Sequence, residues 1–232
     1  MRKEVDRMED RFSKAPLLEY MTDDELKNLE HQPVIKDFKK GEEVFRPGSE
    51  PIYMYVIVSG FMKISMDLSD GREQILYIYG GGDFVGGHNL LTEEKYIYRG
   101  TCLKSSRIIL IHKDDFNRVL KKNNKVLLKV LDQSFKRIRR SEELIDRLSV
   151  INADMKVAKL IIDMIPSYGV KEGKNILIRS NMNREELGSY SGITRETLSR
   201  KLSYFEDLGL IRLLSRGEIL VLDMKGLGEF TI

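Results

Sequence analysis

The feature that most constrains the fold is a series of short β-rich runs, separated by glycine-containing turns, between Pro33 and His112. These runs lie at residues 34–38, 43–46, 52–58, 61–68, 72–79, 96–102 and 107–111. The run 61–68 ends at Ser69-Asp70-Gly71, and an Asp-Gly pair between apolar runs is a strong hairpin signal. Several short strands at this spacing predict an antiparallel sandwich or barrel.

The period of the apolar residues changes to a helical one at Lys113, and residues 125–152 contain neither Gly nor Pro. A heptad-like stripe runs along this segment, with Leu131, Ile138 and Ile145 on one seam, Leu127 and Leu148 on the alternate seam, and Ser134, Ser141 and Asn152 at further seam positions. Such a stripe is typical of a helix packed on its twin from a second chain. The alternative is a long helix that packs on its own domain.

The last third of the chain contains the pattern with the most functional information. An amphipathic helix is predicted over 155–168, interrupted at Pro166, and a strand over 175–178. Asn183, with Glu186 three residues later, predicts a helix start, and Ser191-Gly192-Ile193 predicts a tight turn. Thr194 can cap a second helix. Two helices joined by a short turn with glycine form a helix-turn-helix unit.

The second helix has two different faces at 100° per residue. One arc is apolar and suited to a core: Leu198, Leu202 and Phe205. The opposite arc is polar and lies near the start of the helix: Arg195, Glu196, Ser199 and Arg200. Arginine can pair with guanine and glutamate with cytosine N4, so this arc is suited to reading DNA bases. The alternative is an ordinary solvated helix face.

The residues after this helix favour the DNA-reading interpretation. Residues 210–214 and 219–222 predict two strands around a turn, which would form a β-hairpin wing. Arg216 lies in that turn, where it can meet a phosphate. The sequence therefore predicts a winged helix-turn-helix, with Thr194 and Arg216 completing the expected DNA-binding set.

Composition sets the remaining limits. The net charge of +3 permits nucleic-acid binding, and Cys102, as the only cysteine, excludes an internal disulfide or a four-cysteine cluster within the chain. The three histidines are scattered along the sequence, so no metal site is predicted. The longest run without a charge, 51–62, is too short to span a bilayer. We expect a cytoplasmic protein that makes no contact with membranes.

Taken together, the order of these elements resembles the catabolite activator/fumarate-nitrate regulator (CRP/FNR) family of bacterial transcription factors. The resemblance covers residues 38–223 and is carried by Gly41, Gly48, Gly60, Asp70-Gly71, the segment 82–86 and the segment 195–200. It implies an α+β chain with an effector-sensing jelly roll over 1–112, a long dimerisation helix over 113–152 and a winged helix-turn-helix over 153–232. It also implies a homodimer on near-palindromic double-stranded DNA, with half-sites about 34 Å apart, and RNA polymerase as a partner.

The resemblance assigns roles to the polar arc of the second helix. Arg195, Glu196 and Arg200 match base-contacting positions of the catabolite-activator branch, while Ser199 matches the fumarate-nitrate branch. Half-sites resembling TGTGA or TTGTGA are therefore expected, with the outer bases left open.

The same resemblance argues against cyclic AMP as the effector. In nucleotide-binding members a Gly-Glu pair and an Arg-Ser pair hold the ligand, but here Gly87 follows Gly86, and Tyr96-Ile97 or Ile97-Tyr98 aligns with the Arg-Ser pair. A cyclic phosphodiester would then be a buried charge without a partner. An iron–sulfur cluster is excluded because Cys102 is alone.

Three effector hypotheses stay open. An uncharged or aromatic molecule could bind at four tyrosines, or those tyrosines could simply fill the pocket: Tyr77, Tyr79, Tyr96 and Tyr98. Haem could bind through His88, which follows Gly87 in a segment that resembles that of carbon-monoxide sensors. DNA binding could also need no ligand. Arg137 and Ser141 match positions where the long helix of the family meets the ligand or the partner chain.

Two other function classes receive less support. A metal enzyme of the cupin type needs two or three histidines and a carboxylate at one site, but the strand region has only His88 and His112. The P-loop, Gly-x-Ser-x-Gly and His-Glu-x-x-His motifs are absent. A regulatory subunit that binds a nucleotide is disfavoured by the missing arginine and by the helix-turn-helix. We therefore expect a regulator and no enzyme.

Overall fold

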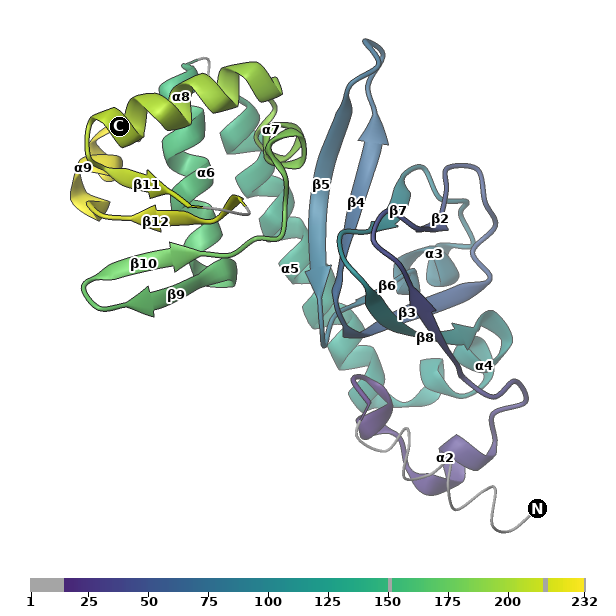
Figure 1. Cartoon of the computed structure of the whole chain (residues 1–232). Helices are drawn as coiled ribbons and strands as arrows, with labels where there is room; N and C mark the ends of the chain where they lie inside the picture. The colour runs from purple at the N-terminus through teal and green to yellow at the C-terminus, as the bar shows by residue number, and fades with distance from the viewer. Residues whose placement is uncertain (1–14, 150–151, 215–216, 232) are drawn as a thin grey trace. The chain divides into compact units, whose positions relative to one another are not determined.

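The computed structural model describes residues 15–149, 152–214 and 217–231 (Figure 1). The chain divides into two compact units, which are described separately below. The first contains residues 1–66 and 77–140, and the second contains residues 67–76 and 141–232.

Two antiparallel four-stranded sheets form the framework of the β-rich part of the described chain. The strands are β1 (Val34–Phe38), β2 (Glu43–Phe45), β3 (Tyr53–Ser59), β4 (Phe61–Asp67), β5 (Glu73–Gly80), β6 (Phe84–Val85), β7 (Arg99–Cys102) and β8 (Ser106–His112). One sheet has the order β1-β8-β3-β6 and the other β2-β7-β4-β5. The predicted antiparallel sandwich is confirmed, and all seven predicted strand runs contain a strand.

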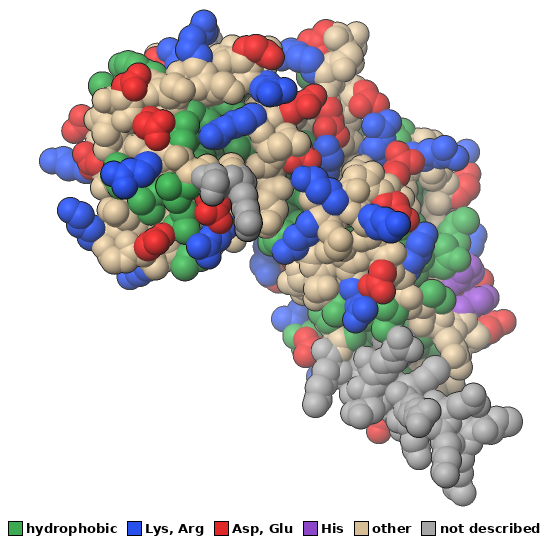
Figure 2. Space-filling view, in the orientation of Figure 1, with side chains coloured by type: hydrophobic (Ala, Val, Ile, Leu, Met, Phe, Trp, Pro, Cys, Tyr) green, Lys and Arg blue, Asp and Glu red, His purple; other side chains and the backbone are tan. Residues whose placement is uncertain are grey.

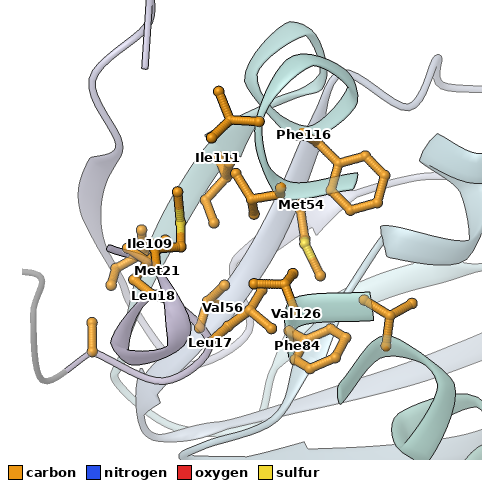
Figure 3. Packing of buried hydrophobic residues seen from close by; sticks show 14 of the residues in the cluster. Leu17, Leu18, Met21, Met54, Val56, Phe84, Ile109, Ile111, Phe116 and Val126 are labelled. Carbon is orange, nitrogen blue, oxygen red and sulfur yellow. The ribbon is translucent and has the colours of Figure 1, made fainter. Parts of the chain in front are cut away.

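The core of the first unit lies between one sheet and the helices that follow it (Figure 3). Met54 and Val56 from β3 and Ile109 and Ile111 from β8 point to the same side, because alternate residues of a strand share a face. Helical and N-terminal side chains cover them: Leu17, Leu18, Phe116, Leu120, Val126 and Val130.

The helical segment after β8 is divided into several pieces. It consists of α4 (Lys113–Arg118), the 3-10 turn η2 (Leu120–Lys122) and the long helix α5 (Asn124–Ser149). The single long helix expected over 113–152 is therefore shorter. The break has a local cause, since the Asn123 side-chain oxygen accepts hydrogen bonds from the backbone N–H groups of Lys125 (2.9 Å) and Val126 (3.1 Å) and so starts a new helix.

The remaining helices of this unit are short: η1 (Leu18–Tyr20), α2 (Asp23–Lys27) and α3 (Gly87–Thr92). In the parts of the chain that the structure describes, no helix combines the length and the apolar character that crossing a membrane needs.

The second unit packs three main helices against a small sheet. Its elements are α6 (Ala153–Tyr168), β9 (Gly169–Glu172), β10 (Asn175–Ile178), α7 (Arg184–Ser191), α8 (Arg195–Asp207), β11 (Ile211–Leu213), β12 (Ile219–Val221) and α9 (Met224–Glu229). The sheet order is β11-β12-β10-β9. The hairpin β11–β12 and the strand β10 were predicted, whereas β9 and α9 were not.

Two details of the helical predictions are corrected. Asn152 is no seam residue of the long helix, because its side chain accepts a hydrogen bond from the Asp154 N–H at 2.8 Å and caps α6. Pro166 does not interrupt α6, which continues to Tyr168 as predicted. A proline removes a single backbone donor, so packing of the buried α6 face can hold the final turn together.

We expect Phe116→Ala to lower the free energy of unfolding of the first unit by about 3–5 kcal/mol, because its fully buried ring would leave a cavity. The matched control is Ile97→Ala, since Ile97 is 75% exposed and its loss should cost less than about 0.5 kcal/mol. Urea titration followed by the near-ultraviolet circular dichroism of tyrosine measures both. Equal shifts for the two variants would contradict the described core.

Candidate functional site

The helix-turn-helix of the second unit is fixed by its caps. The Asn183 side chain accepts from the Glu186 N–H at 2.9 Å, and the Glu186 carboxylate accepts from the Asn183 N–H at 2.8 Å, which completes a capping box at the start of α7. The Thr194 hydroxyl accepts from the Thr197 N–H at 3.2 Å and caps α8. Both predicted helix starts are confirmed.

Two glycines allow α7 and α8 to approach each other. Gly192 ends α7 with φ of +72°, a conformation that glycine adopts without strain. A Cβ atom at Gly188 would lie 2.8 Å from the carbonyl oxygen of Ile193, closer than side chains tolerate. Gly192 was predicted as part of the turn, but Gly188 was not; its signal is a glycine inside the predicted helix, four residues before Gly192.

The two faces of α8 have the predicted burial. Leu198, Leu202 and Phe205 are completely buried. Arg195, Glu196 and Arg200 are exposed, Ser199 is half-buried, and Thr194 is exposed at the cap. Figure 2 shows Lys and Arg side chains along the edge of the second unit that carries α8. The start of α8 therefore presents charged hydrogen-bonding groups on a rigid element.

Polar contacts join α8 to its neighbours within the second unit. The Lys201 ammonium pairs with the Asp154 carboxylate of α6 at 2.7 Å. The Glu206 carboxylate accepts a hydrogen bond from the Leu213 N–H of β11 at 2.7 Å. These contacts fix both the orientation of α8 and the position of the β11–β12 wing. Arg216, the expected phosphate contact, lies outside the described residues.

In the first unit, an arginine lies among the predicted effector residues. The Arg137 guanidinium on α5 lies 5.4 Å from the ring centroids of both Tyr77 and Tyr98. At such distances a cation is attracted to the ring faces. Burial alone would lower the pKa of Arg137, but the interaction with Tyr98 and a hydrogen bond with Tyr77 raise it. The group therefore stays charged.

A second arginine of α5 makes a similar contact. The Arg140 guanidinium lies 5.5 Å from the centroid of the Tyr79 ring and also donates a hydrogen bond to the Ile78 carbonyl at 3.2 Å. Burial raises the pKa of Tyr79, and the positive charges of Arg137 and Arg140 oppose this only in part. The phenol is thus neutral at physiological pH, so its contact with Arg140 is a cation–π interaction and not an ion pair.

Tyr96 belongs to an adjoining aromatic group. Its ring stacks on Phe45 with centroids 4.2 Å apart, and Phe45 also stacks on Tyr55 at 5.3 Å. Tyr96 donates a hydrogen bond to the Tyr53 carbonyl oxygen at 3.3 Å. Tyr98 donates one to the Asn89 side-chain oxygen at 3.1 Å. Tyr98 joins this group to the arginine cluster, because its ring centroid lies 6.3 Å from that of Tyr96 and 6.4 Å from that of Phe45. Phe45, Asn89 and Arg140 were not predicted as site residues.

The other predicted effector residues have varied environments. Gly87 is buried at the start of α3, and His88, next to it, is exposed. Ser141 is half-buried on α5, about one helical turn after Arg137. The structure therefore brings Tyr77, Tyr79 and Tyr98 together with Arg137 and Arg140, whereas Gly87 and His88 lie on α3.

Comparison with known proteins gives one family match in the first part of the chain and another in the last part. Residues 35–123 match the cyclic nucleotide-binding domain and residues 155–230 match the Crp-like helix-turn-helix domain. The fold and the α7–α8 surface thus define a DNA-binding transcriptional regulator with a domain of the cyclic nucleotide-binding type.

Relatives and solved structures specify the family. The "CRP-like cAMP-activated global transcriptional regulator" of Mycobacterium tuberculosis is 27% identical over 198 residues, which cover 85% of this chain and 87% of that protein. An anaerobic regulatory protein of Haemophilus influenzae is 29% identical over 196 residues, or 84% of this chain and 76% of that protein. FixK2 from Bradyrhizobium japonicum has the same fold, with a TM-score of 0.75, 22% identity and coverage of 87% and 98%. The chain belongs to the CRP/FNR family.

We expect Gly188→Ala to destabilise the second unit by about 1–3 kcal/mol, because the added methyl group meets the Ile193 backbone and forces α7 and α8 apart. Ser203→Ala is the control, since Ser203 is exposed on α8. Thermal unfolding followed by circular dichroism compares the two. A stable Gly188→Ala variant would show that the helices do not approach as closely as described.

Proposed function

We propose that this regulator binds a near-palindromic DNA site as a homodimer and reads each half-site with α8. The observation that carries the proposal is the exposure of Arg195, Glu196 and Arg200 at the start of a helix whose opposite face is buried. The protein would act in the bacterial cytoplasm, with RNA polymerase as a partner by family resemblance.

The chemistry of these residues supports base recognition. In the described ranges, Arg195, Glu196 and Arg200 form no ion pair with another residue, so their charges are available to a ligand. An arginine can donate two hydrogen bonds to O6 and N7 of guanine, and a glutamate can accept one from N4 of cytosine. Half-sites related to TGTGA or TTGTGA offer such groups.

The exposed side chains of α5 support the homodimer. Leu128, Leu131, Phe135 and Ile138 are between 50% and 64% exposed, although all four are large and apolar. They follow each other at intervals of three and four residues, which is the spacing of a coiled-coil seam. In this proposal Leu128 and Phe135 belong to the seam, each one residue after the predicted positions Leu127 and Ser134. A second copy of α5 would cover this stripe.

In vitro selection from a random duplex pool tests the DNA-binding proposal. Purified protein without added effector should enrich an inverted repeat whose half-sites contain guanine and whose centres lie about one helical turn apart. Enrichment of single, unrepeated sites would contradict the dimer, and a failure to enrich any sequence with or without effectors would contradict sequence-specific binding.

Arg195→Ala should weaken binding to the selected site by about 1–3 kcal/mol and relax the preference at one G·C pair. Lys171→Ala removes an equal charge from exposed β9 of the same unit and is the control. Fluorescence anisotropy on the selected site and on its G·C variants measures both the loss of affinity and the base preference. An unchanged base preference in Arg195→Ala would show that Arg195 does not recognise a base.

Ile138→Asp should raise the dissociation constant of the dimer at least about 100-fold, which corresponds to about 2.7 kcal/mol, because each dimer would carry two carboxylates in an apolar seam. The control is Arg139→Asp, which places the same charge at an exposed neighbouring position. Sedimentation velocity over a concentration series measures the change. A dimer that is equally stable in both variants would exclude α5 as the interface.

We further propose that a small molecule other than cyclic AMP controls DNA binding through Tyr77, Tyr98 and Arg137. A ligand that enters this cluster has to displace the Arg137 guanidinium from two rings and so alters a contact between β5 and α5. Such a two-state contact is the element that a switch requires. The relative from Mycobacterium tuberculosis is named as cAMP-activated, so the proposal includes a change of effector.

The burial of the tyrosines favours a second candidate, constitutive DNA binding. Tyr77, Tyr79 and Tyr98 are at most 9% exposed and already occupy their space. Control by a small molecule and constitutive DNA binding predict different results for Arg137→Ala, which should alter DNA affinity only if the cluster is a switch. A panel of small aromatic compounds added to the wild-type protein distinguishes them independently. The haem alternative, with exposed His88 as ligand, predicts a haem absorption band that His88→Ala removes.

A further inference from the structure

Two of the three histidines of the chain lie against each other, although they are far apart in the sequence. The ring centroids of His31 and His112 are 4.1 Å apart, with an angle of 30° between the rings. The strand pairing explains this proximity. His31 precedes β1, His112 ends β8, and β1 pairs with β8 from Val34↔Leu110 onward, so both side chains reach the same end of one sheet.

Each imidazole faces a carboxylate. His31 Nδ1 lies 3.5 Å from Asp115 Oδ2, and His112 Nδ1 lies 3.2 Å from Asp114 Oδ2. Ligand atoms of His31, His112 and Asp114 all lie within 4.8 Å of one another. Histidines that bind metal ions commonly donate their second ring N–H to a carboxylate that is not itself a ligand, and the contact of His31 Nδ1 with Asp115 has this arrangement.

The backbone around the pair is held in place by Asp115, which is completely buried. Its carboxylate accepts hydrogen bonds from the backbone N–H groups of Glu30 at 2.7 Å and His31 at 2.8 Å. The Arg118 guanidinium lies 3.3 Å from the same carboxylate and balances its charge. His31 is thereby positioned before any ion arrives.

His112 is positioned from two sides. Its backbone pairs with Tyr53 of β3, and the Tyr53 ring meets the imidazole edge-on, with centroids 5.6 Å apart. Its Nδ1 also lies 3.3 Å from the Asp114 N–H, at the start of α4. The side chains are 45% exposed at His31, 20% at His112 and 55% at Asp114, so an ion can reach them from solvent.

We propose that His31, His112 and Asp114 bind a divalent transition-metal ion of the Zn²⁺ type, with water completing the coordination. Two imidazoles and a carboxylate suit Zn²⁺, Ni²⁺ or Cu²⁺, whereas Mg²⁺ and Ca²⁺ prefer oxygen ligands alone. The bound ion would join the segment before β1 to the start of α4. This site is independent of the DNA-binding proposal, because none of its residues belongs to α8.

Isothermal titration of the full, tag-free chain with ZnCl₂ tests the site. The wild-type protein should bind one Zn²⁺ per chain, and His31→Gln and His112→Gln should each weaken binding at least about tenfold. His88→Gln is the matched control, since it removes the third histidine from exposed α3 and should leave the affinity unchanged. Equal affinity in wild type, His31→Gln and His112→Gln would overturn the proposal, as would the absence of binding.

A spectroscopic measurement keeps the test independent of folding defects, because His112 also caps α4. Cu²⁺ bound to the wild-type chain should show electron paramagnetic resonance couplings to two imidazole nitrogens, and Cu²⁺ bound to His31→Gln should show one at most. Asp114→Asn, at an exposed position, should retain both nitrogens but bind more weakly. Two nitrogens in His31→Gln would place the ion elsewhere and refute the site.

Discussion

The burial of one face of α8 is the constraint on which the functional surface depends. Leu198, Leu202 and Phe205 are completely buried, so rotation of this helix about its axis would expose apolar area at a cost of several kcal/mol. The polar arc that starts at Arg195 faces solvent because the opposite, apolar arc has to be buried. The close approach of α7 and α8 at Gly188 and the cap at Thr194 stabilise the same orientation of α8. The direction of the side chains proposed to read DNA is thus set by core packing, which is independent of DNA.

Local patterns in the sequence were sufficient for most of the fold. Alternation and turn residues predicted the strands of the sandwich, and the capping residues Asn183 and Thr194 predicted the starts of α7 and α8. The break before α5 was missed because asparagine is also common inside loops and on helix surfaces, and only the hydrogen bonds of Asn123 identify it as a cap. The seam of α5 stays a prediction: Leu128 and Phe135 are exposed one residue after the predicted positions Leu127 and Ser134, and periodicity alone does not resolve such a drift.

Contacts between distant segments could not be predicted in this way. The proximity of His31 and His112 depends on the register of β1 against β8, and the grouping of Tyr77 and Tyr98 around Arg137 depends on where α5 crosses β5. A single sequence contains no direct signal for register or crossing. The sequence therefore indicated which residue types were present at the candidate sites but not which of them meet.

The hydrogen bond from the Leu213 N–H to the Glu206 carboxylate has a consequence for how the protein adapts to its target. It ties the first wing strand to the last turn of α8, so both elements would meet the proposed DNA site as one stiff body. A stiff body cannot adjust to an irregular groove, and the duplex has to deform instead. On the proposed near-palindromic target, easily kinked pyrimidine–purine steps between the half-sites would then be favoured at base pairs that no side chain touches.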